Sequence, residues 1–239
     1  MSRKTRRQRL EEGQEAVESV IYRFEEYSKI HPANKSQELA LSSLRNNTLS
    51  ILTGPPGTAK TLLSVYVACE LLHSRAIDKV YYVKPVVDVM GEKGLGFLPG
   101  DLNEKVAPHI APLKDSLEVF MTRGKSEYLL NKKIIEFLPL DHLRGRSLNR
   151  CMVIADEMQN ATTHSVMTVL TRMGQDSKIA LLGDAVQRDL EDRFGRDGLS
   201  DARRRLSCIP DTGCVEFGFQ DIVRSNFVKN VIISYADLY

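Results

Sequence analysis

Residues 51–61 read ILTGPPGTAKT, which differs at one position from the phosphate-binding loop pattern G-x-x-x-x-G-K-[ST]. The difference is Ala59, which stands where the pattern has its second glycine. Apolar residues 49–53 precede the loop, and an apolar helical pattern begins at Lys60. The sequence therefore predicts a strand, a loop and a helix in succession, an arrangement in which backbone N–H groups and a helix N-terminus face a phosphate.

The residues of this loop have separate predicted roles. Lys60 is expected to reach the β- and γ-phosphates of a nucleotide, and Thr61 to ligate Mg²⁺. Gly54 and Gly57 supply the permissive turn positions. Ala59 is expected to have right-handed backbone angles, which accept a methyl group. The predicted nucleotide-binding residues of the loop and first helical turn are Gly54, Pro55, Pro56, Gly57, Thr58, Ala59, Lys60, Thr61 and Leu62.

Two further apolar runs end in residues that suit phosphate chemistry. Residues 151–160 read CMVIADEMQN, so Asp156 and Glu157 follow a predicted strand. Asp156 is expected to hold Mg²⁺ through water, and Glu157 to orient and deprotonate an attacking water, an effect of about 10²–10⁴ in rate. Residues 180–190 read ALLGDAVQRDL and place Asp184 and Gln187 after another strand. Gln187 is predicted to contact the γ-phosphate or the attacking water. Without the phosphate loop, an Asp-Glu pair would be an ordinary strand end and Gln187 an exposed loop residue.

Short apolar runs alternate with helical patterns, which predicts an α/β fold with a parallel sheet. Strands are expected at residues 49–53, 79–83, 134–138, 151–155, 178–182 and 215–219. Helices are expected at residues 60–73, 103–123, 162–173, 198–206 and 222–235, and a short one capped by Ser36 that runs to Asn46 and Asn47. Residues 85–101 contain four glycines and two prolines without periodicity, so they are expected to form a long loop.

Residues 1–33 are expected to form a helical extension and residues 34–239 one P-loop domain, for which 239 residues with 42% apolar content supply enough core. The extension carries an amphipathic pattern over residues 6–28. Its front is basic, which fits either a solvated terminus or an arm that touches nucleic acid or a neighbouring subunit. The basic residues are Arg3, Lys4, Arg6, Arg7 and Arg9.

Composition excludes several classes of protein. Apolar runs fall far short of the ~20 residues that span a bilayer, and the charged N-terminus lacks the apolar segment of a secretory signal, so a cytoplasmic protein is expected. The four cysteines and five histidines lack zinc-ligand spacing, and the thiols are expected to be reduced and mostly buried. The net charge is +2, so any surface for nucleic acid must be local.

Together these motifs resemble the PhoH family of P-loop ATPases, whose core is similar to one RecA-like domain of superfamily 1 helicases. The matching blocks extend from about Asn34 to Tyr235. They are GPPGTAKT, GEKGLGFLPGDLNEKV, LRGRSL, DEMQNAT, LTRMGQDSK, GDAVQRDL and DIVRSNFVKNVI. The resemblance implies an ATPase that uses ATP and Mg²⁺, with the catalytic glutamate directly after the Mg²⁺ aspartate and with another strand between the strands that carry the phosphate loop and this aspartate.

The resemblance also gives Gln37, in NKSQELAL, the role of reading the adenine base, the alternative being a surface glutamine on a capped helix. Three residues depart from the family pattern. Ala59 replaces glycine, Lys84 stands where arginine usually precedes proline, and Ser225 follows Arg224 where histidine is common. Lys84 keeps the positive charge but lacks bidentate phosphate recognition.

A single domain forms only one side of an ATP site that, in two-domain helicases, lies between two domains. In helicases of this kind, an arginine from a second domain stabilises charge on the transferring phosphoryl, an effect of about 10³–10⁵ in rate. A second copy of the chain is expected to supply it, in a head-to-tail homo-oligomer that the resemblance implies is a hexameric ring. The candidate trans or sensor arginines are Arg224 first, then Arg193 and Arg144.

The leading functional prediction is ATP-driven binding, translocation or unwinding of single-stranded nucleic acid, with RNA favoured by the resemblance. Basic residues at the long loop and in the segment LRGRSLNR could contact phosphates, but Phe97 is the single aromatic residue there that could stack on a base. These basic residues are Lys84, Lys93, Arg144, Arg146 and Arg150. The alternatives are a small-molecule P-loop kinase and a nucleotide-gated scaffold that unwinds nothing.

Overall fold

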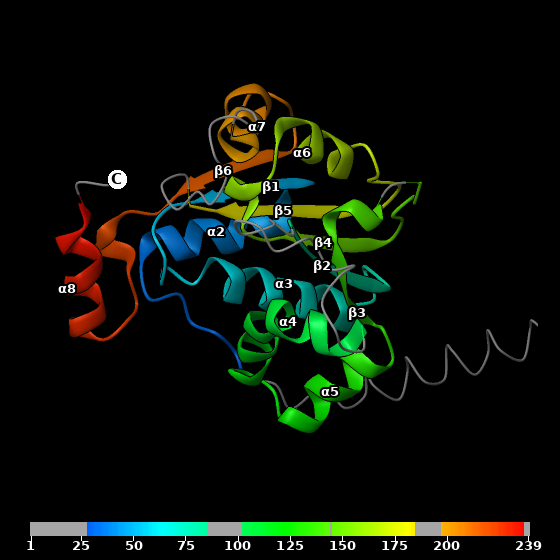
Figure 1. The fold of residues 1–239 in the computed structure, drawn as a ribbon, viewed down its shortest axis with the longest axis horizontal. Coiled ribbons are helices and arrows are strands. Elements are labelled where there is room, and N and C mark those ends of the chain that lie inside the picture. Colours follow the sequence, from blue (N-terminus) through cyan, green and yellow to red (C-terminus); the bar gives the residue numbers. More distant parts are fainter. Residues whose placement is uncertain (1–27, 86–101, 144, 185–196, 237–239) are drawn as a thin grey trace, which may run out of the picture.

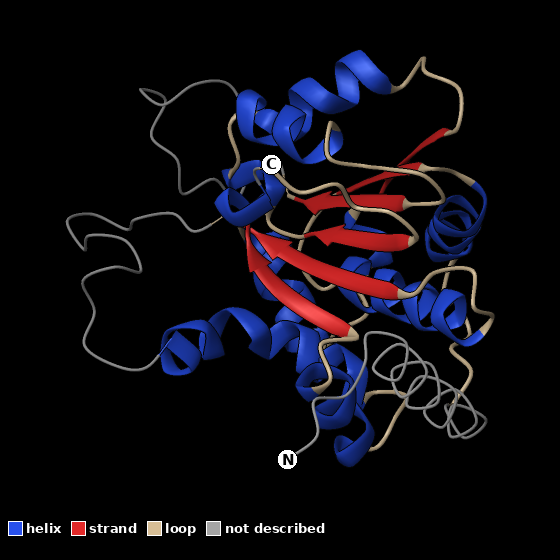
Figure 2. Cartoon of the chain, turned by 90° about the vertical axis from the view of Figure 1, so that its right-hand side faces the viewer, coloured by secondary structure: helices blue, strands red, loops and turns tan. Residues whose placement is uncertain are grey.

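The computed structural model of the chain describes residues 28–85, 102–143, 145–184 and 197–236. Within these ranges the chain forms a six-stranded sheet, all of whose neighbouring strands are parallel, in the order β3-β2-β4-β5-β1-β6. The strands are β1 (Leu49–Thr53), β2 (Lys79–Lys84), β3 (Ile135–Pro139), β4 (Cys151–Ala155), β5 (Lys178–Gly183) and β6 (Thr212–Glu216). Figure 2 shows the arrowheads of the strands pointing the same way. The predicted α/β class is confirmed.

Helices cover both faces of the sheet (Figure 1). One face is covered by α2 (Lys35–Asn46), α3 (Lys60–His73), α4 (Leu102–Glu118) and α5 (Arg123–Asn131). The other is covered by α6 (Thr163–Leu170) and α7 (Gly198–Leu206). Because neighbouring strand residues point to opposite faces, Leu52 packs with the first group of helices and Ile51 with the second. Both faces are therefore covered, which explains why every residue of β1 and β4 is buried.

The strand order brings three strand ends to one edge of the sheet. β5 lies between β1 and β4, so the expectation of a strand between the two motif-bearing strands is confirmed. Thr53 pairs with Gly183, and Ala155 with Leu181. Because the strands are parallel, the residues that follow β1, β4 and β5 meet at the carboxyl edge, where open α/β sheets bind ligands.

Several predicted boundaries are wrong. β6 begins at Thr212, three residues before the predicted start, because its pairing with β1 begins at Leu49 opposite Thr212. α2 is capped by Asn34, whose side chain accepts from the N–H of Gln37, and not by Ser36. The helix predicted over residues 103–123 ends at Glu118, and α5 begins separately at Arg123.

Two shorter helices and the cysteines also differ from expectation. α6 ends at Leu170, short of the predicted Met173. The last helix, α8 (Asn226–Ser234), begins four residues late because the Ser225 side chain caps it. Cys69 and Cys151 are buried but Cys208 and Cys214 are exposed, so the expectation of mostly buried thiols is wrong. The predicted N-terminal helix over residues 6–28 and most of the loop over residues 85–101 lie outside the described residues.

Candidate nucleotide-binding site

The loop between β1 and α3 has the backbone shape of a phosphate-binding loop. Gly54 and Gly57 have φ values of 134° and 78°, which favour glycine. A Cβ atom at Gly54 would lie 2.4 Å from the carbonyl oxygen of Phe217, and one at Gly57 would lie 2.7 Å from Cγ of Arg224. Both positions thus need glycine for their angles and for the close approach of the segment after β6.

Ala59 has left-handed backbone angles, with φ 71° and ψ 19°. The expectation of right-handed angles is therefore wrong. α3 begins at the next residue, and the loop must turn sharply to present its N–H groups at the helix N-terminus. An L-residue in this conformation carries a strain of about 1–2 kcal/mol, which explains why the general pattern has glycine here.

Replacing Ala59 by glycine is expected to raise the free energy of unfolding by about 0.5–1 kcal/mol, because relief of the strain exceeds the extra backbone entropy that glycine loses on folding. The corresponding rise in Tm is about 1–4 °C, measurable by calorimetry. Ala68→Gly, inside α3, is the matched control and should lower Tm. A lower Tm for Ala59→Gly would contradict the strain assignment.

The Lys60 side chain lies over its own loop. Its Nζ donates to the carbonyl oxygens of Gly54 at 2.6 Å and Pro55 at 2.9 Å, and to Oγ1 of Thr58 at 3.3 Å. Burial lowers the pKa of Lys60, although the nearby carboxylates of Asp184, Asp156 and Glu157 offset part of this effect. An ammonium group that is desolvated and held by uncharged oxygens is well suited to receive an anion such as a phosphate.

Thr61 and Asp156 bring the first helical turn of α3 to the end of β4. Oγ1 of Thr61 donates to Oδ2 of Asp156 at 3.1 Å, and Asp156 is 5% exposed. Two more donors reach this carboxylate: the hydroxyl of Tyr82 at 2.5 Å from Oδ2 and the N–H of Glu157 at 3.0 Å from Oδ1. Sequence reasoning missed Tyr82, because its contact with Asp156 depends on the pairing of β2 with β4.

The hydroxyl of Thr61 and the carboxylate of Asp156 fit Mg²⁺, which prefers hard oxygen ligands. In the part of the chain that the structure describes, no group of three or more His, Cys, Asp and Glu side chains could hold a metal ion. In nucleotide enzymes Mg²⁺ is usually bound by one or two protein oxygens together with phosphates of the substrate, and Thr61 and Asp156 fit this mode.

Glu157 lies directly beyond Asp156 and is 48% exposed at its side chain. Its Oε2 accepts from Nε2 of Gln159 at 2.7 Å, and its Oε1 lies 4.0 Å from Nζ of Lys84. Gln159, which is 1% exposed, also accepts the N–H of Asp184 through Oε1 at 3.1 Å. Gln159 thus joins the ends of β4 and β5. The motif block DEMQNAT contained it, but no signal in one sequence assigned its role.

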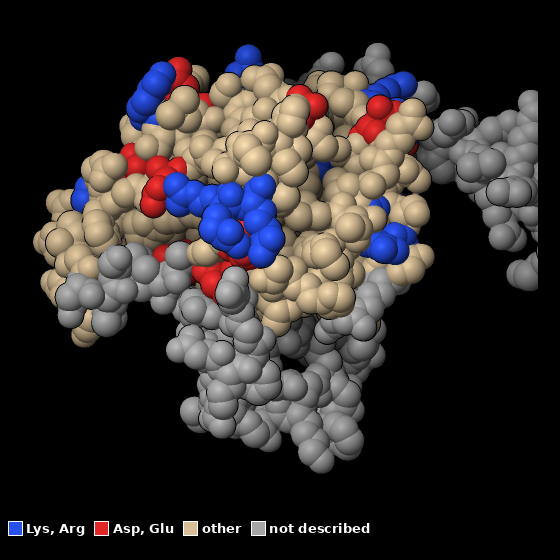
Figure 3. All heavy atoms as spheres, turned by 90° about the horizontal axis from the view of Figure 1, so that it is seen from above, with Lys and Arg blue, Asp and Glu red and all other residues tan. Residues whose placement is uncertain are grey.

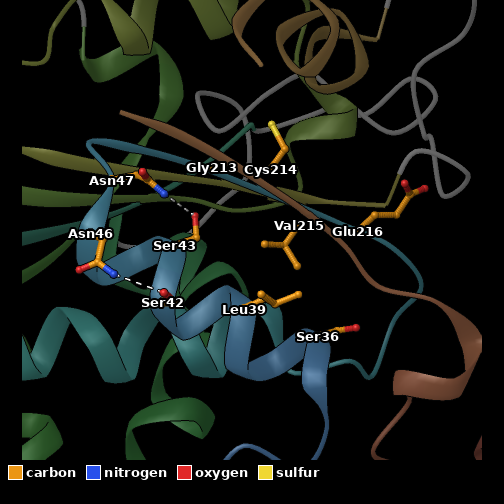
Figure 4. A pocket seen from close by; sticks show the side chains of 10 residues that line it. All are labelled: Ser36, Leu39, Ser42, Ser43, Asn46, Asn47, Gly213, Cys214, Val215 and Glu216. Carbon is orange, nitrogen blue, oxygen red and sulfur yellow. Dashed lines mark hydrogen bonds between the residues drawn. The ribbon is translucent and has the colours of Figure 1, made fainter. Parts of the chain in front are cut away.

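Gln37 is buried and lies against the phosphate loop. Its Oε1 accepts the N–H of Ala33 at 2.8 Å, and its Nε2 donates to the carbonyl oxygen of Thr58 at 3.5 Å. At 3% exposure it is no surface glutamine, so that alternative is wrong. A hollow of about 470 Å³ lies between α2 and the edge strand β6 (Figure 4). Leu39 and Val215 line this hollow, and no predicted nucleotide-binding residue does.

Arg224 lies at the phosphate loop of its own chain. The N–H of Val223 donates to the carbonyl oxygen of Gly57 at 2.9 Å, and Arg224 packs its Cγ over the same glycine. A role at this chain's own site therefore needs no second copy. The other two candidate arginines, Arg193 and Arg144, lie outside the described residues, as do Gln187, Lys93 and Phe97.

Two of the remaining basic residues, Lys84 and Arg150, are far apart on the sheet. Lys84 ends β2 beside the site, whereas Arg150 precedes β4 and therefore lies at the opposite edge of the sheet. There Arg150 pairs with Asp78, with Nε 2.8 Å from Oδ2. Arg150 is thus separate from Lys84, and contact of these basic residues with nucleic-acid phosphates stays a prediction. On the face that carries α6 and α7, basic side chains gather near the middle, and acidic side chains border them (Figure 3).

Comparison with known proteins agrees with this geometry. The family model of the PhoH-like protein matches residues 29–236. The chain belongs to the PhoH family. A PhoH-like protein of Bacillus subtilis is 36% identical over 226 residues, covering 95% of this chain and 70% of the relative. Protein PhoH of Escherichia coli K12 is 34% identical over 211 residues, covering 87% of this chain and 59% of the relative.

This PhoH-family chain thus spans 59% to 70% of the length of these relatives. A crystal structure of Pif1 helicase from Candida albicans aligns over 83% of this chain and 43% of that chain, with 15% identity and a TM-score of 0.42. The family and the phosphate loop together make the chain a P-loop NTPase. None of the described helices is long and apolar enough to span a bilayer.

Proposed function

We propose that this PhoH-family chain binds and hydrolyses ATP with Mg²⁺ and acts as an oligomer. The contact between Thr61 and Asp156 carries the proposal, because it joins the phosphate loop to the aspartate that precedes Glu157. A loop that binds phosphate and a carboxylate that activates water are the two parts that a nucleotide hydrolase needs.

Each residue of the site has a proposed task. Lys60 moves from the loop carbonyls to the phosphates, and the N–H groups of the loop bind phosphate oxygens. Mg²⁺, when bound between Thr61 and Asp156, would neutralise charge on those oxygens. Glu157 accepts the proton of the attacking water, while Gln159 holds one of its two carboxylate oxygens and so fixes its orientation. Gln187 remains the proposed sensor of the γ-phosphate.

Hydrolysis distinguishes the proposal from a small-molecule kinase. Release of inorganic phosphate from ATP, measured without any acceptor metabolite, supports the hydrolase. Transfer of phosphate to a nucleoside or metabolite in place of release would support the kinase. The exposed position of Glu157 next to Asp156 favours the hydrolase, because a general base at this place can reach water.

We further propose that ATP hydrolysis drives binding, translocation or unwinding of single-stranded nucleic acid, with RNA favoured over DNA. The support is the family and Lys84 at the carboxyl edge, 12% exposed and close to Glu157. Stimulation of phosphate release by RNA or DNA at low salt tests this coupling. Stimulation by neither, with ATP hydrolysis intact, would favour the nucleotide-gated scaffold.

A second copy of the chain is the proposed second wall of the site, in a homo-oligomer that the family suggests is a hexameric ring. Helix α8 supports this proposal, because none of its residues is buried and it lies at the edge of the molecule (Figure 1). Phe227 is 78% exposed and Tyr235, just beyond the helix, is 61% exposed. Apolar side chains exposed together in this way usually mark a protein interface. Because α8 follows Arg224, a copy that covers it would lie beside the phosphate loop.

Phe227→Asp is expected to shift the protein from oligomer to monomer at micromolar concentration, because it places a charge in the proposed apolar interface. Light scattering with nucleotide present measures the mass. Val119→Asp, which replaces another exposed apolar residue, between α4 and α5, is the matched control and should leave the mass unchanged. A wild-type monomer would contradict the ring, and an oligomer that survives Phe227→Asp would exclude α8 from its interface.

A further inference from the structure

Tyr82 is a core residue that reaches into the candidate nucleotide site. It lies on β2 opposite Ile154 of β4, is fully buried, and donates its hydroxyl proton to Oδ2 of Asp156 at 2.5 Å. That distance is at the short end of the range for an O–H donor and a carboxylate acceptor. The contact therefore ties a side chain of the sheet core to the carboxylate that we propose holds Mg²⁺.

The ring of Tyr82 has little freedom to move. Phe137 packs against it with ring centroids 6.3 Å apart, and Nζ of Lys84 lies 5.9 Å from its centroid. The hydroxyl of Tyr82 is the donor and the carboxylate of Asp156 is the acceptor, so the packed ring holds the donor at a fixed place.

Oδ2 of Asp156 accepts from two side chains that come from different elements. Tyr82 approaches from β2, and Thr61 approaches from the first turn of α3. To ligate a metal ion, Oγ1 of Thr61 must point a lone pair at the ion while its hydroxyl hydrogen stays directed at Oδ2 of Asp156. The position of Oδ2 therefore sets the orientation of the hydroxyl. A donor fixed in the core, such as Tyr82, determines the position of Oδ2.

We infer that Tyr82 is a positioning residue for the magnesium site, which holds Asp156 in the geometry that Mg²⁺ and Thr61 require. The inference rests on the proposed function, because it concerns the Mg²⁺ of a bound nucleotide. The inference gives the hydroxyl of Tyr82, which phenylalanine would lack, the role of holding Asp156 in place. In a purely structural role, the same hydroxyl would affect the stability of the fold and leave the response to Mg²⁺ unchanged.

Tyr82→Phe separates these two roles, because it keeps the ring and removes the hydroxyl. The affinity for a fluorescent ATP analogue is measured by titration at increasing Mg²⁺ concentrations and again in EDTA. In EDTA the variant should bind as the wild type does. The Mg²⁺ concentration that produces half of the full gain in ATP-analogue affinity should rise by about 10-fold in the variant. This is the lower end of the loss in metal affinity that follows removal of a residue hydrogen-bonded to a metal ligand.

Tyr81→Phe is the matched control. Tyr81 is the preceding residue on β2, it packs with the helices of the other face of the sheet, and its ring lies 4.9 Å from Nζ of Lys79. This variant loses the same hydroxyl group at a place remote from Asp156, so its response to Mg²⁺ should equal that of the wild type. Thermal unfolding of both variants confirms that each is folded at the temperature of the titration.

Two results would overturn the inference about Tyr82 and leave the proposed function intact. One is a Mg²⁺ response of Tyr82→Phe equal to that of the wild type, and the other is an equal loss of affinity in EDTA and in Mg²⁺, which would indicate general damage to the site. Failure of the proposed function would look different, because the wild type itself would then bind the nucleotide equally with Mg²⁺ and with EDTA. That result would overturn the inference as well.

Discussion

Lys60→Ala is expected to weaken ATP binding by about 100-fold or more. A charge-assisted hydrogen bond contributes about 1.5–3 kcal/mol, and the ammonium group is expected to make one to the β-phosphate and one to the γ-phosphate, so about 3 kcal/mol or more is lost. Because burial already lowers the pKa of Lys60, loss of the ammonium group removes a desolvated charge, and Tm should change little. Isothermal titration with ATP and Mg²⁺ measures the affinity, and calorimetry measures Tm.

Lys35→Ala is the control for this change. Lys35 lies in the first turn of α2, pairs with Glu38 at 2.9 Å, and is 75% exposed at its side chain. Its replacement removes the same charge from the surface and should leave ATP affinity unchanged. A Lys60→Ala protein that binds ATP as the wild type does would contradict the assignment of the phosphate loop.

Glu157→Gln is expected to lower kcat for ATP hydrolysis by about 10²–10⁴, because the amide cannot accept the proton of the attacking water. ATP affinity should stay close to that of the wild type, since Lys60, Thr61 and Asp156 remain. The hydrogen bond from Gln159 also persists, because the amide oxygen of glutamine accepts as the carboxylate does. Single-turnover phosphate release, with binding measured in parallel, separates the two effects.

Glu70→Gln is the matched control. Glu70 lies on α3, far from the carboxyl edge of the sheet, and its Oε2 lies 2.9 Å from Nε of Arg45. The variant should hydrolyse ATP as the wild type does. If Glu157→Gln kept full activity, another residue would have to be the base. If it held ATP in a stable oligomer while the wild type separated no strands, the scaffold function would gain support over unwinding.

The sequence predicts those parts of the fold in which local pattern and tertiary burial agree. Strands β1 and β4 and helices α3 and α7 have the predicted bounds, because both strands are buried throughout, α3 starts directly after the phosphate loop and Asp197 caps α7. β6 does not, because it is an edge strand without a fully buried residue, and its limits come from pairing with β1. A pattern of buried residues cannot reveal a strand that buries so little.

The candidate site shows the same division. Lys60, Thr61, Asp156 and Glu157 follow strand ends, and the parallel sheet brings strand ends together whatever the details of packing. Tyr82 was not predicted, because a tyrosine in an apolar strand resembles any other core residue until the register of β2 against β4 is known. The prediction of right-handed backbone angles at Ala59 was wrong for another reason. The shape of the loop imposes left-handed angles there, against the intrinsic preference of alanine.

The turn at Val223 and Arg224 joins the phosphate loop to helix α8, through the hydrogen bond to Gly57 and the packing of Arg224 over it. A molecule that covers α8 and alters this turn would change the affinity of the loop for nucleotide. Thermodynamic linkage then requires the converse by the same factor, so nucleotide would change the affinity of α8 for that molecule. The coupling free energy can thus be measured in two ways. One measures assembly at two nucleotide concentrations, and the other measures nucleotide binding at two protein concentrations.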